Sequence, residues 1–499
     1  MKHLKTFKGI VLSILLVCML VTLTACGGDN GGSTTTTTTG NAYKGTPKIS
    51  IDEWIGWQSL LDANGGLVTA PDSLNAKRGI SVEYVVMNDA TTSSSALISG
   101  ELVGAGYTVN RYAFLQNKFD EAKLEVVMPY ITNFSNGGDG IIAEADIMSV
   151  EDLVGKKIAV PKFSEAQTLV EWLLNNSSLS DAQRSKIRSD MVLFETPDDA
   201  AKAFFSGQVN AAATWEPYLT QAANSTDSRI LFDTSMSTNL ILDGIVFRKD
   251  FVENNGDFVT KLIDAALEAS SMYKVEFANI RKLPMFELMS DAEIIDMANG
   301  ANLATWTQNM QLLSDVAVTM YADMANVWIG LGETAHPAKA KAAFTDVYMA
   351  NLRGTYEGKD TATSVTNFSQ EEKTMLIESP EALLSYNADI KFALNSVEIQ
   401  QSSYAELDEF VKVAKVLDGV YIQIEGNAAQ RADGVSDAQI IDFSENRAQS
   451  VANYFMSQGI SSERIIIIGN GDMKPLNSEN LAAPENRRTE IYFKTKLGY

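Results

Sequence analysis

The chain has 499 residues, of which 45% are hydrophobic, and its formal net charge at neutral pH is −23. This length predicts more than one domain, and the negative charge excludes nucleic acid as a partner. The two cysteines are Cys18 and Cys26, and the two histidines are His3 and His336. We therefore expect no metal site, no cofactor and no chemistry that depends on histidine or cysteine.

The N-terminus has the pattern of an exported and lipid-anchored protein. Three lysines within the first eight residues precede an apolar stretch from Ile10 to Leu23, which is short for a membrane span but suits the core of a signal peptide. The tetrapeptide LTAC that follows resembles the lipobox of bacterial lipoproteins. This resemblance implies removal of residues 1–25 and diacylation of Cys26, and two acyl chains give stable anchoring. An ordinary cleaved signal with an incidental cysteine is the alternative interpretation.

Two polar segments separate the parts that are predicted to fold. Residues 26–47 are rich in Gly, Ser and Thr and have almost no apolar content, so we expect a flexible tether. Residues 354–387 are polar again and form the predicted linker, in which 375–384 has the pattern of a short helix. These segments leave one domain over residues 48–353 and a second over residues 388–495.

In the first domain, strand patterns alternate with helix patterns. This alternation predicts βαβ units with mostly parallel sheets, an α/β fold in which ligands bind beyond the carboxyl ends of the strands. Strands are predicted at residues 48–57, 79–87, 124–130, 140–145, 157–161 and 191–196. Residues 91–107 are predicted to form a helix with a Ser or Thr cap that runs into a Gly-rich turn, and further helices are predicted at 164–177 and 196–207.

Five short motifs in this domain occur in a recognisable order. They are WIGW, SGE, DGIIA, DLVGKKIAVP and AAATWEP, and together they resemble the solute-binding proteins of ABC importers of the nitrate, sulfonate and taurine type over residues 48–353. The resemblance implies a two-lobed type II periplasmic-binding fold, a small-molecule solute and an ABC permease as partner. Val103 departs from the acidic residue that this family often has at that position.

Side chains at the ends of the predicted strands are candidates for ligand binding, because the resemblance implies that these strand ends face the cleft between the lobes. Aromatic rings can wall such a cleft, and the free N–H groups of a helix start can receive a polar or anionic atom. Two interpretations stay open, since a tryptophan at a strand end can belong to the core and Ser164 can simply cap its helix. The candidates are Trp54, Trp57, Thr108, Ser164, Trp215, Glu216 and Asp243, with Asn110 as a weaker one.

The charges of these candidates favour a neutral or amine-bearing solute. Glu216 and Asp243 are acidic, and no arginine or lysine of the same segments is obviously placed in the cleft. A buried anion needs donors or positive potential. Backbone donors alone can hold an anion, so nitrate, sulfonate and bicarbonate remain open.

A different pattern of predicted strands and helices begins at Ala388. Strands are predicted at 388–395, 420–427, 464–472 and 487–495, with helices at 404–417 and 436–459. This β-α-β-α-β-β order is that of a small α/β sandwich. The segments FALNS, IEGNAA, FSENRA and ENRRTEI resemble the OmpA-like peptidoglycan-binding domain.

The resemblance implies a clamp on the diaminopimelate residue of peptidoglycan, made by an aspartate and a helix arginine. Arg447 matches the arginine, but Ala429 stands at the aspartate position, Asn427 at the histidine position and Ile440 at an asparagine position. Asn427, Arg447 and Arg488 are the candidate peptidoglycan-binding residues. Because half of the clamp is missing, wall binding and a purely structural role for these residues both remain open.

Together these features predict a lipid-anchored solute-binding component of an ABC importer. Its place is the cell envelope, at the outer face of the cytoplasmic membrane or in the periplasm. The alternative is a wall-associated structural or sensory lipoprotein whose cleft does not serve transport. Pyrimidine-synthesising relatives share the two-lobed fold, but they use a histidine and a cysteine-rich segment that this chain lacks, so we expect no enzyme.

Overall fold

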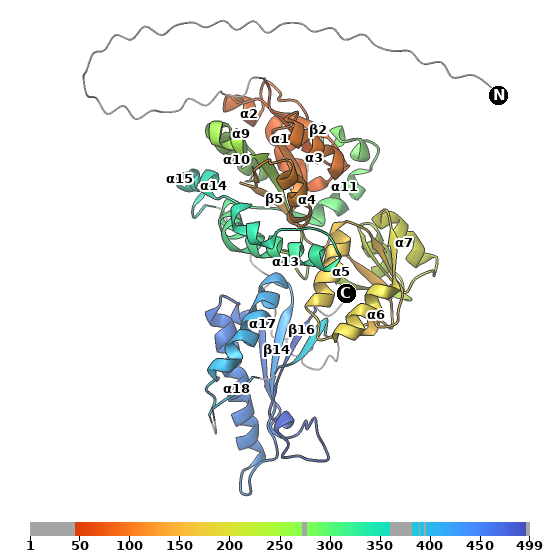
Figure 1. Ribbon diagram of the computed structural model, residues 1–499, viewed down its shortest axis with the longest axis vertical. Helices are drawn as coiled ribbons and strands as arrows, with labels where there is room; N and C mark the ends of the chain where they lie inside the picture. The colour runs from red at the N-terminus through yellow and green to blue at the C-terminus, as the bar shows by residue number, and fades with distance from the viewer. Residues whose placement is uncertain (1–44, 272–276, 360–381, 389, 394–395, 496–499) are drawn as a thin grey trace, which may run out of the picture. The chain divides into compact units, whose positions relative to one another are not determined.

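A computed structural model describes residues 45–271, 277–359, 382–388, 390–393 and 396–495 (Figure 1). The predicted signal peptide, the lipid site at Cys26 and most of the tether lie outside the described residues, as does most of the helix expected at 375–384. Among the helices that are described, none is both long and apolar enough to cross a membrane.

Among the described residues, the first sheet has seven strands in the order β12-β5-β11-β3-β1-β2, with β4 also paired to β11. Strand β1 runs parallel to β2 and β3, whereas β11 is antiparallel to β3, β4 and β5. The strands are β1 (Lys48–Ile51), β2 (Glu83–Val86), β3 (Gly104–Thr108), β4 (Val126–Val127), β5 (Ile131–Ser135), β11 (Leu242–Arg248) and β12 (Ala301–Leu303).

Helices from the chain segments before residue 136 and after residue 241 lie beside this sheet (Figure 1). They are α1 (Gln58–Asn64), α2 (Leu74–Lys77), α3 (Ala90–Ser99), α4 (Val109–Glu121), α9 (Lys249–Asn254), α10 (Gly256–Ser271), α11 (Asp291–Asn299), α12 (Trp306–Gln311), α13 (Ala317–Gly330), α14 (Val347–Ala350) and α15 (Arg353–Tyr356).

A second sheet is formed by one continuous stretch of chain between β5 and β11, in the order β10-β6-β9-β7-β8. The chain therefore crosses between the two sheets twice, through residues 136–138 and 234–241. This arrangement agrees with the two-lobed α/β fold that the resemblance implies. The elements are β6 (Asp139–Glu144), β7 (Ile158–Pro161), β8 (Met191–Phe194), β9 (Ala211–Trp215), β10 (Ser228–Asp233), α5 (Glu165–Asn175), α6 (Asp181–Asp190), α7 (Pro197–Phe205) and α8 (Tyr218–Ala223).

Side-chain caps begin the helices that follow the parallel strands. The side chains of Asp89, Thr108, Ser164 and Thr196 each accept a backbone N–H of the first turn of α3, α4, α5 and α7. Such a cap satisfies one of the N–H groups that a helix start leaves without a partner. Helix α3 was expected to have a Ser or Thr cap, and Asp89 fills that place because its carboxylate accepts the same N–H group.

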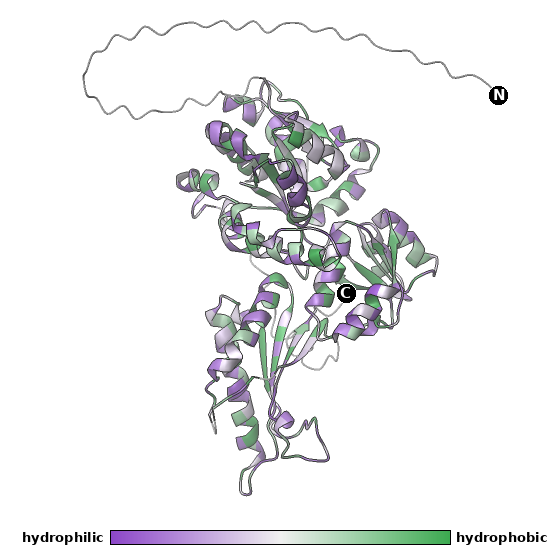
Figure 2. Cartoon of the chain, viewed as in Figure 1, coloured by the Kyte–Doolittle hydropathy of each residue, from purple (hydrophilic) through white to green (hydrophobic). Residues whose placement is uncertain are grey.

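The last domain contains the predicted β-α-β-α-β-β order. Its sheet has the order β13-β16-β14-β15, in which β14 is parallel to β15 and antiparallel to β16. In Figure 2 its strands are mainly hydrophobic, whereas α18 alternates between polar and apolar residues. The elements are β13 (Leu384–Ala388), α17 (Tyr404–Val416), β14 (Tyr421–Gly426), α18 (Asp437–Ser457), β15 (Ile465–Gly469) and β16 (Thr489–Lys494).

The opening strand of this domain lies earlier than predicted. We expected it at 388–395, but the described residues of that stretch contribute only an isolated bridge between Phe392 and Ile399. The strand is β13, which pairs Leu384 with Phe493 of β16 and ends at Ala388. Leu384 and Ala388 are buried, so this earlier segment has the apolar surface that the sheet needs.

Candidate functional site

A cavity of about 630 Å³ lies where the carboxyl ends of parallel strands from both sheets meet. Asp52 follows β1, Thr108 ends β3, Ser164 follows β7, and Trp215 ends β9. Ligands of open parallel sheets bind at such strand ends. The cavity is therefore at the place that the strand and helix order predicts.

Most of the candidate residues line this cavity, namely Trp54, Thr108, Ser164, Trp215, Glu216 and Asp243. Trp57 and Asn110 lie outside the lining. Trp57 is 1% exposed, and its indole N–H donates to Asp52 at 2.6 Å. Asn110 is equally buried, and its amide donates to Thr168. For these two residues the structure supports a role in the core.

The two tryptophans of the lining are held through their indole N–H groups. Trp54 donates to Asn133 at 3.0 Å, and Trp215 donates to Asp198 at 3.0 Å. Both side chains are partly buried. Because the polar end of each ring has a partner, the ring itself is free to form an apolar wall.

The hydroxyl groups of the lining act as helix caps. Ser164 accepts the N–H of Gln167 at 3.2 Å and donates to the carbonyl of Pro161 at 2.6 Å. Thr108 accepts the N–H of Arg111 at 3.0 Å. The helix starts at the cavity are therefore already capped by the chain itself, which leaves fewer free donors for a bound anion.

Glu216 is also engaged by the chain. Its carboxylate accepts the backbone N–H of Thr220 at 3.1 Å and the hydroxyl of the same residue at 2.9 Å. The negative charge thus lies at the first turn of α8, where it is favourable. Glu216 thus lines the cavity, but its carboxylate already accepts two hydrogen bonds from the chain.

Two basic residues that the sequence analysis missed line the cavity. Arg111 forms a two-pronged pair with Glu165, with Nε–Oε1 and Nη2–Oε2 distances of 2.9 Å each. Lys162 lies 2.6 Å from Glu195. Burial alone would raise the pKa of Glu165, but the charge of Arg111 and its hydrogen bonds bring that pKa below its usual range. Arg111 lies three residues after the cap Thr108, a spacing that could have placed it at the cleft.

Three aspartates of the lining, Asp52, Asp139 and Asp243, form no ion pair within the described parts of the chain. Burial raises the pKa of each of them, to about 7 for Asp139. The pKa of Asp243 is raised well above its usual value, by burial first and then by the neighbouring charges of Asp52, Glu165 and Asp139. The four carboxylates therefore share one electrostatic environment. Asp52 and Asp139 were missed, although Asp139 opens the DGIIA motif.

Asp139 also lies at the point where the chain crosses between the sheets. Ser135 donates its hydroxyl to Asp139 at 2.7 Å and lies 2.8 Å from the hydroxyl of Thr234. The N–H of Gly137 donates to Thr234 at 2.9 Å. These bonds join the two crossover segments and hold the Asp139 carboxylate in place.

Among the described residues, no group of three or more His, Cys, Asp or Glu side chains could hold a metal ion. The carboxylates of the lining are therefore not arranged as a set of metal ligands in this part of the chain.

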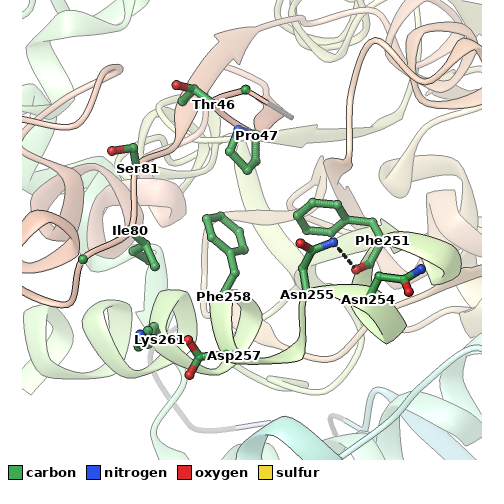
Figure 3. Close-up of a pocket in the computed structure, with 12 residues that line it drawn as sticks. Thr46, Pro47, Ile80, Ser81, Phe251, Asn254, Asn255, Asp257, Phe258 and Lys261 are labelled. Atoms are coloured by element: carbon green, nitrogen blue, oxygen red, sulfur yellow. Dashed lines mark hydrogen bonds and ion pairs between the residues drawn. The ribbon is translucent and has the colours of Figure 1, made fainter. Parts of the chain in front are cut away.

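A second hollow of about 560 Å³ lies beside α10 (Figure 3). Asn255 donates its amide to the carbonyl of Phe251 at 2.9 Å, and Lys261 pairs with Asp257 at 2.8 Å. Its polar groups are thus paired with one another. We therefore take the cavity at the strand ends as the candidate solute site.

In the last domain, Arg447 of α18 lies between two aromatic rings. Its guanidinium carbon is 4.9 Å from the ring centroid of Phe392 and 4.4 Å from that of Phe443, and its Nε donates to the carbonyl of Ser396 at 3.1 Å. Burial and the charge of Arg487 lower the pKa of Arg447. Within the described residues Arg447 has no carboxylate partner, and we call this place the Arg447 site.

The other two candidates of this domain are held by structural contacts. Asn427 is 2% exposed and donates its amide to Glu490 at 3.1 Å. Arg488 donates to Glu490 at 3.0 Å and to the carbonyl of Lys474 at 3.1 Å. Of the three candidate wall-binding residues, Arg447 alone has no acidic partner in the described structure.

The fold is a two-lobed α/β domain with a cavity at its strand ends, followed by a small α/β sandwich. The NMT1/THI5 like family matches residues 75–274, and the OmpA family matches residues 391–489. The chain therefore carries an NMT1/THI5-like domain fused to a C-terminal OmpA domain, which confirms the predicted combination.

Individual relatives match each domain. The putative aliphatic sulfonates-binding protein of Escherichia coli is 30% identical over 135 residues, which cover 26% of this chain and 40% of that protein. Outer membrane protein A of Buchnera aphidicola is 31% identical over 103 residues, or 20% of this chain and 29% of that protein. The chain thus spans less than half the length of these curated relatives. The crystal structure of the periplasmic aliphatic sulphonate binding protein from Escherichia coli aligns with a TM-score of 0.47 at 17% identity, covering 59% of this chain and 96% of that one.

The relatives that match the first domain are named as binding proteins. The two domains together support an extracytoplasmic binding component of the cell envelope.

Proposed function

We propose that this chain captures a small solute in the cavity at the strand ends and presents it to an ABC permease. The observation that carries the proposal is a cavity of about 630 Å³ lined by strand ends of both sheets. A relative named as a sulfonates-binding protein supports it. Ligand contacts made only when the two lobes are closed would stabilise the closed form.

Thermal unfolding of the purified full chain with a solute panel tests this function. The panel holds amines, amides, urea, pyrimidines, nitrate, bicarbonate and sulfonates. A ligand present at about 100 times its Kd stabilises its domain by ~2.7 kcal/mol. We expect Trp215→Ala to remove the shift and Trp215→Phe to keep most of it, because phenylalanine retains a ring at the wall. No shift from any solute would overturn the transport function and leave a wall-associated structural or sensory lipoprotein.

We further propose that Cys26 carries the lipid anchor and that the chain is held at the outer face of the cytoplasmic membrane or in the periplasm. The basic and apolar residues before LTAC support this proposal. Cells fed a labelled fatty acid should label the wild-type chain. Cys26→Ser should abolish the label and release the chain from the membrane, and an unchanged label would refute the anchor.

For the last domain we propose contact with peptidoglycan through Arg447. The match to the OmpA family supports the domain, and the lack of an acidic partner leaves the guanidinium available for a carboxylate of the stem peptide. Co-sedimentation of the full chain with purified peptidoglycan tests it. Arg447→Gln should lower the bound fraction, whereas Lys412→Gln, on the neighbouring α17, should not.

A further inference from the structure

The basic groups of the cleft are already neutralised by carboxylates of the chain. Nε and Nη2 of Arg111 donate to Glu165 at 2.9 Å, and Lys162 pairs with Glu195. A guanidinium recognises a sulfonate or carboxylate through two such N–H groups. Glu165 therefore occupies one of the edges through which Arg111 could bind an anionic solute.

The acidic groups of the cleft, in contrast, exceed the basic ones. Asp52, Asp139 and Asp243 line the cavity without an ion pair in the described structure. Asp243 is only 5% exposed, and its carboxylate forms no ion pair with any of the described residues. Together with Glu165, these aspartates make four carboxylates in a lining that holds one guanidinium, that of Arg111.

Carboxylates gathered in a water-poor cavity repel one another and lose hydration. They remain charged only where a cation is nearby, and they otherwise take up protons. The missing charge could come from a metal ion or from a solute. No group of side chains in the described ranges could hold a metal ion, so the arrangement favours a solute that carries its own positive charge.

The walls of the cavity indicate which chemical groups the rest of such a solute would carry. Trp54 and Trp215 present rings whose N–H groups are already engaged. A cation is attracted to the face of an indole ring, and an apolar body packs against it. The cavity of about 630 Å³ has room for an organic molecule.

We propose, resting on the proposed function, that the solute is an organic cation whose ammonium group lies among Asp52, Asp139 and Asp243. The carbon skeleton then contacts the aromatic walls. The Glu165–Arg111 pair disfavours anionic solutes at the same site, because the Glu165 carboxylate repels them and already takes the Nε and Nη2 donors of the guanidinium. This charge preference is opposite to the one in the printed names of the sulfonate-binding relatives.

Matched probes separate the charge from the skeleton. The full chain is titrated calorimetrically with 1-butylamine, 1,4-diaminobutane and benzylamine, then with the alcohols and the sulfonates of the same skeletons. We expect the amines to bind at least tenfold more tightly than the alcohols, and the sulfonates to show no heat. Ca²⁺ and Mg²⁺ serve as metal probes and should not compete with the amines.

Two variants locate the ammonium group. Asp243→Asn and Asp139→Asn keep the shape of the side chain and remove its charge, and each should weaken amine binding tenfold or more. Asp257→Asn is the matched control, because Asp257 lines the second hollow and pairs with Lys261. The melting temperature of each variant without ligand verifies folding, and two independent variants keep the test valid if one fails to fold.

The outcomes distinguish failure of the cationic-solute proposal from failure of the proposed binding function. Sulfonates or alcohols that bind as well as amines overturn the cationic solute and leave the binding function standing. Amine binding unaffected by both variants also overturns the site, as does displacement of the amines by Ca²⁺ or Mg²⁺. If none of these probes binds and no solute of the wider panel shifts the unfolding temperature, the proposed solute-binding function itself is overturned.

Discussion

The cleft and the Arg447 site have opposite electrostatic imbalances. In the cleft, Asp52, Asp139 and Asp243 form no ion pair in the described structure, and Nε and Nη2 of the one guanidinium donate to Glu165. In the Arg447 site the guanidinium lies between two rings and has no acidic partner among the described residues. The first domain thus has carboxylates without an ion pair, and the last domain has a guanidinium without one.

This difference teaches that fold and charge are separate determinants of a site. Strand ends and helix starts decide where a cavity forms. The charges around it decide which ligand can replace water, because a buried charge without a partner costs more than any single neutral contact returns. The fold alone therefore predicts a binding place, and the unpaired charges predict what it binds.

The largest expected effect comes from breaking the Glu165–Arg111 pair. The two side chains are only 20% and 28% exposed, so Glu165→Ala leaves a largely buried guanidinium without its partner. We expect a loss of about 2–3 kcal/mol in the free energy of unfolding, measured with urea. The freed prongs should also let the cleft bind a sulfonate.

Glu195→Ala is the matched control for that experiment. Glu195 is 75% exposed in its pair with Lys162, and exposed pairs contribute about 1 kcal/mol or less. Equal losses from the two variants would show that the Arg111 pair is no more buried in solution than the Lys162 pair.

The pH dependence of stability tests the unpaired aspartates. Burial raises the pKa of Asp139 from 3.8 to about 7. Between about pH 4 and pH 7 the folded chain then binds more protons than the unfolded chain, so the contribution of Asp139 to stability falls as the pH rises. The slope from one group is at most about 1.4 kcal/mol per pH unit.

Urea unfolding of the ligand-free chain at pH 5 and pH 7.5 measures this slope. Asp139→Asn cannot titrate, so the difference between wild type and variant isolates this one group. We expect the variant to lose less stability over the interval. An identical slope would mean that Asp139 titrates at its ordinary pKa and is not desolvated.

Much of the fold could be predicted because its elements carry local signals. Helix α17, which the sequence predicts at 404–417, buries Leu407, Phe410 and Ala414. Strand β5 was missed, since Ile131–Ser135 has apolar residues only at Ile131 and Phe134 and so lacks the alternation that predicts a half-buried strand. Its polar side chains are buried because they find partners, such as the carbonyl of Asp243 for Thr132.

The site could be predicted only in part. The rule that ligands bind at strand ends identified Trp54, Trp215 and Asp243, which all line the cavity. It could not separate Trp57, whose indole turns back to Asp52. Ion pairs between positions more than fifty residues apart, such as Arg111 with Glu165, leave no local pattern, so the charge balance of the cleft needed the structure.

Introducing an aspartate at position 429 would test the comparison between the cleft and the Arg447 site in the last domain. The resemblance to the OmpA-like domain predicts that Ala429 takes the place of the family's aspartate, and Ala429 is 9% exposed. A charge-assisted hydrogen bond is worth about 1.5 kcal/mol or more. Ala429→Asp should therefore tighten binding of a diaminopimelate peptide to the full chain about tenfold in calorimetry. Ala429→Asn is the control, and equal gains from both variants would rule out an ammonium contact.

The smallest expected effect concerns the stacking of Arg447. Each ring contributes about 0.5–1 kcal/mol through its contact with the cation, and the centroids of Phe392 and Phe443 lie 4.9 and 4.4 Å away. Arg447→Gln should lower the free energy of unfolding by about 1 kcal/mol, measured with urea in the full chain. Arg447→Lys keeps the charge but loses the planar group, so its loss should be smaller. If Gln and Lys both leave stability unchanged, the rings do not hold the guanidinium, and its orientation toward a wall carboxylate must come from the ligand.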